Sequence, residues 1–81
     1  MSFENERQML FKIVANVFGL PIAEVNEELS MQNTVAWDSF NHLMLISEVE
    51  KALHVKFSMA EMQGIKTLRA IIDKIRDYGT T

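Results

Sequence analysis

Apolar residues recur at helical spacing near the start of the chain. Between Phe3 and Phe18 they fall three and four positions apart, at Leu10, Ile13, Val14 and Val17, with Met9 and Phe11 widening the stripe. This spacing predicts a helix with one buried face. Gly19 can adopt the left-handed conformation that ends helices, and Pro21 cannot continue one. We therefore expect the first helix to end at Phe18.

A second periodic stretch runs from about Ser39 to Leu53. The residues that we expect to face the core are Leu43, Ile46, Val49 and Leu53, with Leu45 on the flank. The opposite side holds Asn41, Met44, Glu48 and Lys51, which we expect to face solvent or a partner. An exposed apolar side chain such as Met44 favours a binding surface.

Residues 20–37 form a connection longer than ordinary helix-to-helix loops, and loops of that size usually have a function or contain a short turn of their own. The residues after Pro21 could supply such a turn. Apolar residues recur along the connection, and we expect four of them to anchor it to the core: Ile22, Val25, Leu29 and Val35.

Two further helices are predicted beyond His54. Ser58 and Glu61 have the spacing of a capping box, and Gly64 ends a short helix from about Ser58 to Gln63. Thr67 can cap a last helix that ends before Gly79, with its apolar positions at Leu68, Ile71, Ile72 and Ile75. The predicted fold class is all-α: a single domain over residues 1–81, built as a four-helix bundle with a short third helix and a long loop between helices one and two.

The residues at the start of the second predicted helix form the candidate functional site. Asp38 is a good N-cap because its carboxylate can accept hydrogen bonds from the free N–H groups of the first turn. Ser39 would then be the first helical residue, with its hydroxyl pointing outward. The N–H groups and the positive end of the helix dipole favour a negative group at this point, so a phosphodiester on Ser39 would be well placed.

Composition narrows the class of protein. The chain has no Cys, which excludes disulfides and thiolate metal ligands, so a thiol would have to come from an attached group. Its net charge is -3 and its Lys and Arg residues are scattered, which argues against nucleic acid as a partner. No apolar run approaches membrane-spanning length. We expect a monomeric cytoplasmic protein.

Catalysis and metal binding have weak support. Ser39 and His42 lie three positions apart on one predicted helix and could pair. A serine nucleophile also needs an orienting partner for its base and an oxyanion site, and a small filled bundle offers no obvious pocket for them. We interpret His42 as a solvated surface residue and His54 as an ordinary residue at a helix end, and we predict neither an enzyme nor a metal site.

Asp38-Ser39-Phe40, placed after a long loop and before the apolar stripe of the second helix, resembles the acyl carrier protein family. The resemblance covers nearly the whole chain, with Phe40 where the family's Asp-Ser-Leu motif has Leu. A three-residue motif alone is poor evidence, but its position and the helix pattern together make it specific.

The resemblance implies that Ser39 receives 4'-phosphopantetheine from coenzyme A through a phosphopantetheinyl transferase. The protein would then carry acyl or related groups as thioesters between acyl-loading and acyl-processing enzymes. Asp38 would present Ser39, and the docking face would comprise Phe40, Met44 and Glu48. The resemblance also implies that the core opens between the second and third helices to shelter part of an acyl chain.

Two departures from the family pattern favour a specialised fatty acid, polyketide or nonribosomal peptide pathway over housekeeping fatty acid synthesis. The outer face of the second helix is only weakly acidic, and Trp37 precedes the motif where small residues are common. The alternative hypothesis is an unmodified helical protein-protein interaction module in which Ser39 only begins a helix.

Overall fold

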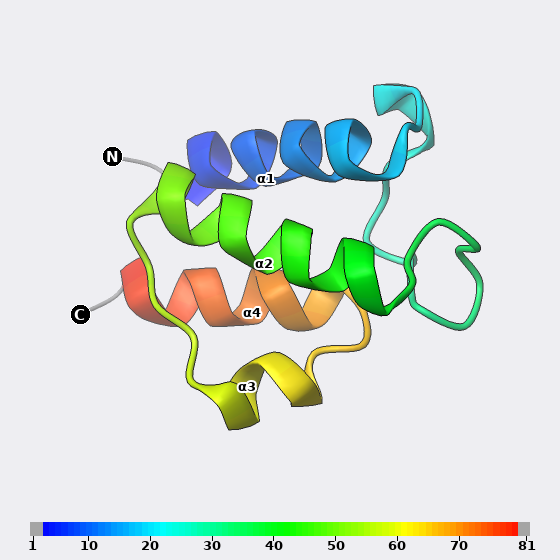
Figure 1. The fold of residues 1–81 in the computed structure, drawn as a ribbon. Helices are drawn as coiled ribbons and strands as arrows, with labels where there is room; N and C mark the ends of the chain where they lie inside the picture. Colours follow the sequence, from blue (N-terminus) through cyan, green and yellow to red (C-terminus); the bar gives the residue numbers. More distant parts are fainter. Residues whose placement is uncertain (1–2, 80–81) are drawn as a thin grey trace.

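The computed structural model describes residues 3–79, which form four α-helices and one 3₁₀ turn (Figure 1). In chain order these are α1 (Phe3–Phe18), η1 (Ile22–Glu24), α2 (Ser39–Leu53), α3 (Met59–Gly64) and α4 (Leu68–Gly79). Within this range there is no β-strand beyond an isolated bridge between Ser30 and Thr67. The all-α prediction is confirmed, as are the short third helix and the long loop.

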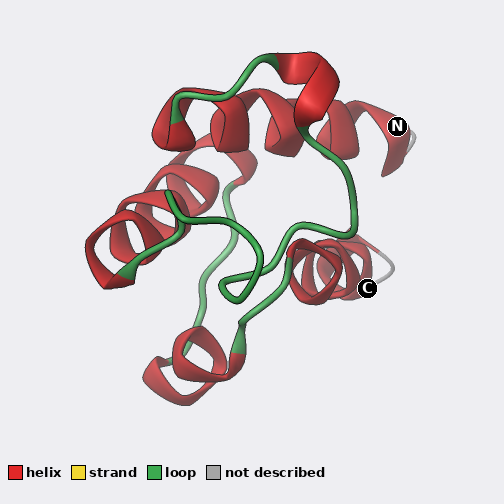
Figure 2. Cartoon of the chain, turned by 90° about the vertical axis from the view of Figure 1, so that its right-hand side faces the viewer, coloured by secondary structure: helices red, strands yellow, loops and turns green. Residues whose placement is uncertain are grey.

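Figure 2 shows α1, α2 and α4 from the end where the long loop lies, with that loop passing between them and α3 set apart below α2. The three long helices and the segments between them share a core which, among residues 4–77, contains fourteen buried apolar side chains: Leu10, Val14, Phe18, Val25, Trp37, Leu45, Ile46, Val49, Val55, Ile65, Leu68, Ile71, Ile72 and Ile75. No helix among residues 3–79 is long and apolar enough to cross a membrane.

The end of α1 has the predicted geometry. Gly19 has φ +68°, and the next N–H, that of Leu20, donates to the carbonyl of Ala15 at 3.0 Å. This bond satisfies one of the carbonyls that a helix end leaves without a partner. The chain leaves α1 at this turn and enters the loop through η1, as expected from Pro21.

The buried face of α2 differs from the predicted one. Leu43 is 54% exposed, whereas Leu45 is fully buried and continues a stripe that begins at His42. Ile46 and Val49 are buried and Leu53 packs partly against the core, as predicted, but counting only apolar residues put Leu43 in the place that His42 takes. Met9, expected to widen the stripe of α1, is likewise 41% exposed.

Two of the four predicted loop anchors are also wrong. Val25 is buried and Leu29 packs partly against the core, but Ile22 is 52% exposed and Val35 fully exposed. Val35 lies inside a tight turn, closed by a hydrogen bond from the Trp37 N–H to the Thr34 carbonyl, that directs its side chain outward.

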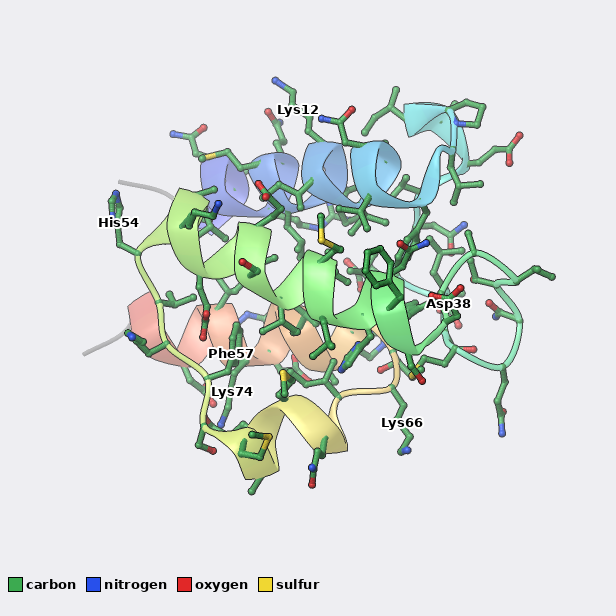
Figure 3. The ribbon with its side chains drawn as sticks, viewed as in Figure 1. Lys12, Asp38, His54, Phe57, Lys66 and Lys74 are labelled. Carbon is green, nitrogen blue, oxygen red and sulfur yellow. The ribbon has the colours of Figure 1, made fainter. Side chains whose placement is uncertain are left out.

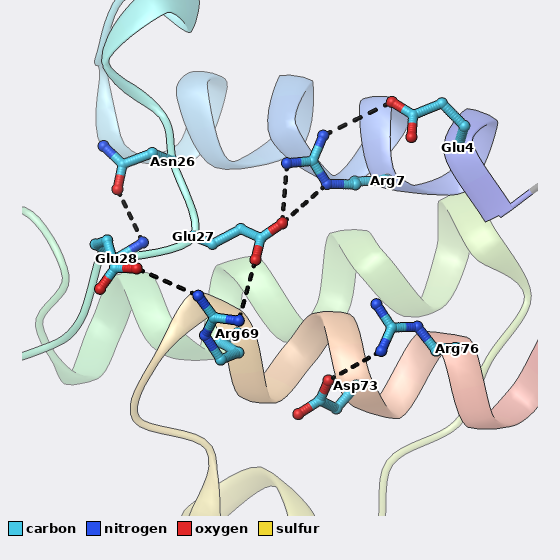
Figure 4. A network of polar contacts seen from close by, with 8 residues as sticks. All are labelled: Glu4, Arg7, Asn26, Glu27, Glu28, Arg69, Asp73 and Arg76. Carbon is cyan, nitrogen blue, oxygen red and sulfur yellow. Dashed lines mark hydrogen bonds and ion pairs between the residues drawn. The ribbon is translucent and has the colours of Figure 1, made fainter.

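Backbone and ionic contacts hold the loop together with these apolar anchors. Its carbonyl at Leu29 accepts from the N–H of Leu68 at 2.9 Å, next to the Ser30–Thr67 bridge. Glu27 bridges two helices, with one carboxylate oxygen 2.9 Å from Arg7 of α1 and the other 3.3 Å from Arg69 of α4 (Figure 4). These contacts fix the path of the chain toward the start of α2.

Candidate functional site

Asp38 and Ser39 occupy the junction between the long loop and α2. Asp38 is extended, with φ -99°, and its carboxylate accepts a hydrogen bond from the N–H of Asn41 at 2.8 Å. The Asn41 side chain donates in turn to the carbonyl of Ala36, also at 2.8 Å. The predicted N-cap is confirmed, and these bonds fix the loop end against the first turn of the helix.

Ser39 is the first residue of α2 and is exposed. The first turn of this helix contains no acidic residue, and the carboxylate of Asp38, which directly precedes Ser39, accepts a hydrogen bond from the Asn41 N–H. Figure 3 places Asp38 at one end of α2 and His54 at the other. An accessible hydroxyl at the positive end of a helix suits a phosphodiester linkage.

A hollow of about 560 Å³ opens beside Ser39, between α2 and α3. Its lining is mainly apolar, and Lys66 is the one charged residue in it. The full lining is Met31, Ser39, His42, Leu43, Met59, Met62, Gln63, Ile65 and Lys66. The exposure of Leu43 is explained by this position, since its side chain faces the hollow and not the shared core.

A second groove, of about 370 Å³, lies on the other side of α2, against α1. It contains all three residues expected on the docking face, Phe40, Met44 and Glu48, together with Ile13 and Val17 of α1. Phe40 is 69% exposed and Met44 42% exposed. The side of α2 that we expected to face solvent or a partner therefore forms one wall of a groove. The sequence pattern did not predict that α1 forms the other wall.

His42 is buried, so its interpretation as a solvated surface residue was wrong. The indole N–H of Trp37 donates to His42 Nδ1 at 3.0 Å, and His42 Nε2 lies 2.8 Å from the carbonyl oxygen of Met62. Trp37 also packs against Phe18, with ring centroids 5.3 Å apart. Both ring nitrogens of His42 thus have partners other than Ser39, which argues against His42 as a base for a serine nucleophile.

The other predictions about chemistry concern His54 and metals. His54 is an exposed helix-end residue, as expected, and adopts φ +56° directly after α2. Across the described part of the chain, no three His, Asp or Glu residues are grouped as metal ligands would be.

α3 is fixed at its first turn by a capping box and an ion pair. Ser58 accepts from the N–H of Glu61, and the Glu61 side chain accepts from the N–H of Ser58. Lys74 of α4 pairs with the same carboxylate. The hydrogen bond from Lys74 and the one from the Ser58 N–H hold the pKa of Glu61 below its usual value.

Comparison with known proteins agrees with this geometry. The family described as "Phosphopantetheine attachment site" matches residues 8–75, which include both helices around the hollow and the loop before Ser39. The chain therefore belongs to the acyl carrier protein family, whose members carry a covalent 4'-phosphopantetheine group. Among individual relatives, it is 21% identical to the acyl carrier protein of Saccharopolyspora erythraea over 66 residues, which is 82% of this chain and 70% of that protein.

Proposed function

We propose that Ser39 is the attachment point of 4'-phosphopantetheine and that the chain, a single carrier domain, holds acyl or related intermediates as thioesters. The observation that carries this proposal is the exposed Ser39 hydroxyl at the first position of α2, directly after the Asp38 cap. Members of the family carry 4'-phosphopantetheine, which ends in a thiol. The chain has no cysteine and therefore no thiol of its own.

The residues around Ser39 fit the group in charge and in shape. In the attachment step, Ser39 Oγ loses its proton and bonds to the phosphorus of the pantetheine phosphate, while the diphosphate bond of coenzyme A breaks and adenosine 3',5'-bisphosphate leaves. The first-turn N–H groups of α2 then face the phosphodiester charge. Once bound, the group supplies the thiol for thioester formation, and Asp38 holds the helix end that presents it.

On this proposal the protein is a carrier and not an enzyme. The only histidine close to Ser39 in sequence has both nitrogens engaged elsewhere, so no base for catalysis by the chain is evident among the described residues. Its partners are a phosphopantetheinyl transferase and the enzymes that load and process the acyl group. A monomeric state and a cytoplasmic location stay predictions from the sequence.

The groove formed by α1 and α2 is our proposed docking surface. Phe40 and Met44 give it exposed apolar area, and its charge is limited to Glu48. A partner should therefore present an apolar projection and not a broad basic patch. This weakly acidic surface is also the reason to propose a specialised fatty acid, polyketide or nonribosomal peptide pathway.

The test of the attachment site is intact-mass measurement. Incubation with coenzyme A and a broad-specificity transferase should add one phosphopantetheine to the wild-type chain and to Ser47→Ala, which removes another exposed serine of α2. Ser39→Ala should gain nothing. Modification of Ser39→Ala would show that the site is wrong, and an unmodified wild-type chain would favour the alternative, an interaction module without a prosthetic group.

The docking surface is tested by Met44→Glu. Met9→Glu is the matched control, because Met9 is almost equally exposed but does not line the groove. We expect Met44→Glu alone to weaken binding of the loaded carrier to its cognate enzyme, by about tenfold for an apolar contact at the centre of an interface. Wild-type affinity should change little across a salt series, since few exposed charges are available to screen. A steep salt dependence, or tighter binding by Met44→Glu, would show docking by charge.

A further inference from the structure

We infer that His42 is a positioning residue, which joins the long loop to α3 and so holds one wall of the hollow beside Ser39. It does this only as a neutral ring with its proton on Nε2. The consequence for cargo on Ser39 rests on the proposed function, whereas the link to α3 does not.

The tautomer follows from the two partners of the ring. The indole N–H of Trp37 is a donor only, so His42 Nδ1 must accept and carries no proton. The carbonyl of Met62 is an acceptor only, so Nε2 must donate. One neutral tautomer satisfies both contacts. A second proton on the ring would set two N–H groups against each other at the Trp37 contact.

The bond to Met62 matters because it is a polar contact that adds to the partial packing of the Met62 side chain and to buried Ile65 just after the last turn of α3. None of the six residues of α3 is buried. Its first turn has the capping box and the Lys74 pair, but the carbonyls of a helix's last turn lack partners within the helix. Among residues 3–79, the Met62 carbonyl accepts from the N–H of Ile65, at 3.3 Å, in addition to His42.

The same contact shapes the hollow. His42, Met62 and Ser39 all belong to its lining, so a shift of the last turn of α3 away from α2 widens the space next to the serine hydroxyl. Within this lining, His42 Nε2 and the Met62 carbonyl oxygen are joined by a hydrogen bond of 2.8 Å. We expect an acyl thioester on Ser39 to be less shielded when this bond is lost.

The charged groups around His42 are few. Lys66 is the only one in the lining of the hollow, and Asp38 caps the same helix four residues earlier. On α3 the acid is Glu61, which is paired with Lys74. None of these replaces the indole as the partner of Nδ1.

Two substitutions separate the two contacts. His42→Asn keeps an acceptor near the position of Nδ1 but is too short to reach Met62, whereas His42→Gln keeps a donor near the position of Nε2 and loses the acceptor for Trp37. His54→Asn is the matched control, because His54 is exposed at the far end of α2 and Asn tolerates its left-handed conformation.

Amide hydrogen exchange on the full chain, with and without the arm, measures the link. We expect exchange in α3 to be about tenfold faster in His42→Asn, the effect of losing one partner of a buried hydrogen bond, and near wild type in His42→Gln and His54→Asn. The rate at which hydroxylamine cleaves an octanoyl thioester on the loaded carrier should also rise in His42→Asn. Wild-type exchange in His42→Asn, or equal acceleration in α1 and α4, would overturn the proposal.

A measurement on the unaltered chain makes the proposal independent of whether these variants fold. Nitrogen-15 shifts of His42 at about pH 8 should show the Nε2–H tautomer, and the Nδ1–H form would refute it. Trp37 is the only tryptophan, so its emission should change in His42→Gln, which loses the acceptor for the indole N–H, and should stay as in the wild type in His54→Asn. Unchanged emission in His42→Gln would overturn the Trp37 contact on which the tautomer rests. A modified Ser39 together with unchanged α3 exchange would refute only the role of His42.

Discussion

α3 and α4 follow one another in the chain but are held in place by different forces. α4 buries Leu68, Ile71, Ile72 and Ile75, none of them more than 2% exposed. No residue of α3 is fully buried: Met62 packs partly against the core, and the helix is otherwise held by its capping box, the Lys74 pair and the bond from His42. Apolar burial from Leu68 to Ile75 supports α4, whereas α3 depends mainly on a few polar contacts.

The difference has a direct consequence for dynamics. Apolar packing is shared with the whole core, so α4 should open only when the domain unfolds. Polar contacts at the surface are individually small and can break one at a time. We therefore expect α3, and with it the wall of the hollow beside Ser39, to open at a lower free energy than α4.

The largest expected effect is in α4. Ile71→Ala should lower the free energy of unfolding by about 2–5 kcal/mol, the range for removing buried methyl groups, because Ile71 is fully buried. Urea melts measure this loss. Val35→Ala is the control at a fully exposed side chain and should stay within about 0.5 kcal/mol of wild type. A loss of less than about 0.5 kcal/mol in Ile71→Ala would show that apolar burial does not hold α4 in place.

An intermediate effect comes from removing equivalent caps. Thr67 accepts from the N–H of Ala70 and Ser58 from that of Glu61, both at 3.1 Å. Losing such a cap costs about 0.5–2 kcal/mol. We expect Thr67→Ala to lower global stability by that amount in urea melts, and Ser58→Ala to act mainly on hydrogen exchange within α3. Equal losses of global stability would mean that α3 unfolds together with the core.

The smallest expected effect is at Glu61. Glu61→Gln keeps an acceptor for the Ser58 N–H but removes the charge paired with Lys74, so protection of α3 should fall several-fold while the urea midpoint stays unchanged. Because the folded pKa is lowered, the contribution of the pair is complete above the usual value of 4.5 and is lost as the pH falls through the lower folded value.

Hydrogen exchange across this acid range supplies the test. Wild-type protection of α3 should decrease with falling pH, and Glu61→Gln should show no such decrease. Glu48→Gln, which removes an exposed i,i+3 pair with Lys51 on α2, is the control and should behave as wild type. A matching acid response in Glu61→Gln would exclude this pair as a stabiliser of α3.

The sequence predicted the parts of the fold that depend on local chemistry. The caps at Asp38, Ser58 and Thr67 and the stop at Gly19 are short-range features, and each was confirmed. The burial of α4 was also predicted, because its stripe consists entirely of apolar residues. Such signals need no knowledge of what packs against the helix.

What the sequence did not predict depends on contacts between distant segments. The buried stripe of α2 begins at His42, which the pattern counted as polar and exposed. The hydrogen bond from Trp37 to His42 Nδ1 forms only once the loop packs against the helix. The groove that we propose for docking is completed by Ile13 and Val17 from α1. A buried Trp five residues before a His at a helix start is the one sequence signal that could have suggested the pair.

The contacts of the long loop bear on how fast the domain folds. Arg69 and Glu28 lie 41 residues apart in the chain, and Arg7 and Glu27 lie 20 apart. Such pairs can form only after long segments have been closed into loops, an entropic barrier that local helix contacts do not face. We expect these ion pairs to be absent from the folding transition state, so that replacing Glu27 speeds unfolding and leaves the folding rate nearly unchanged. The loop that leads to Ser39 would then contribute to the lifetime of the native state more than to the speed of reaching it.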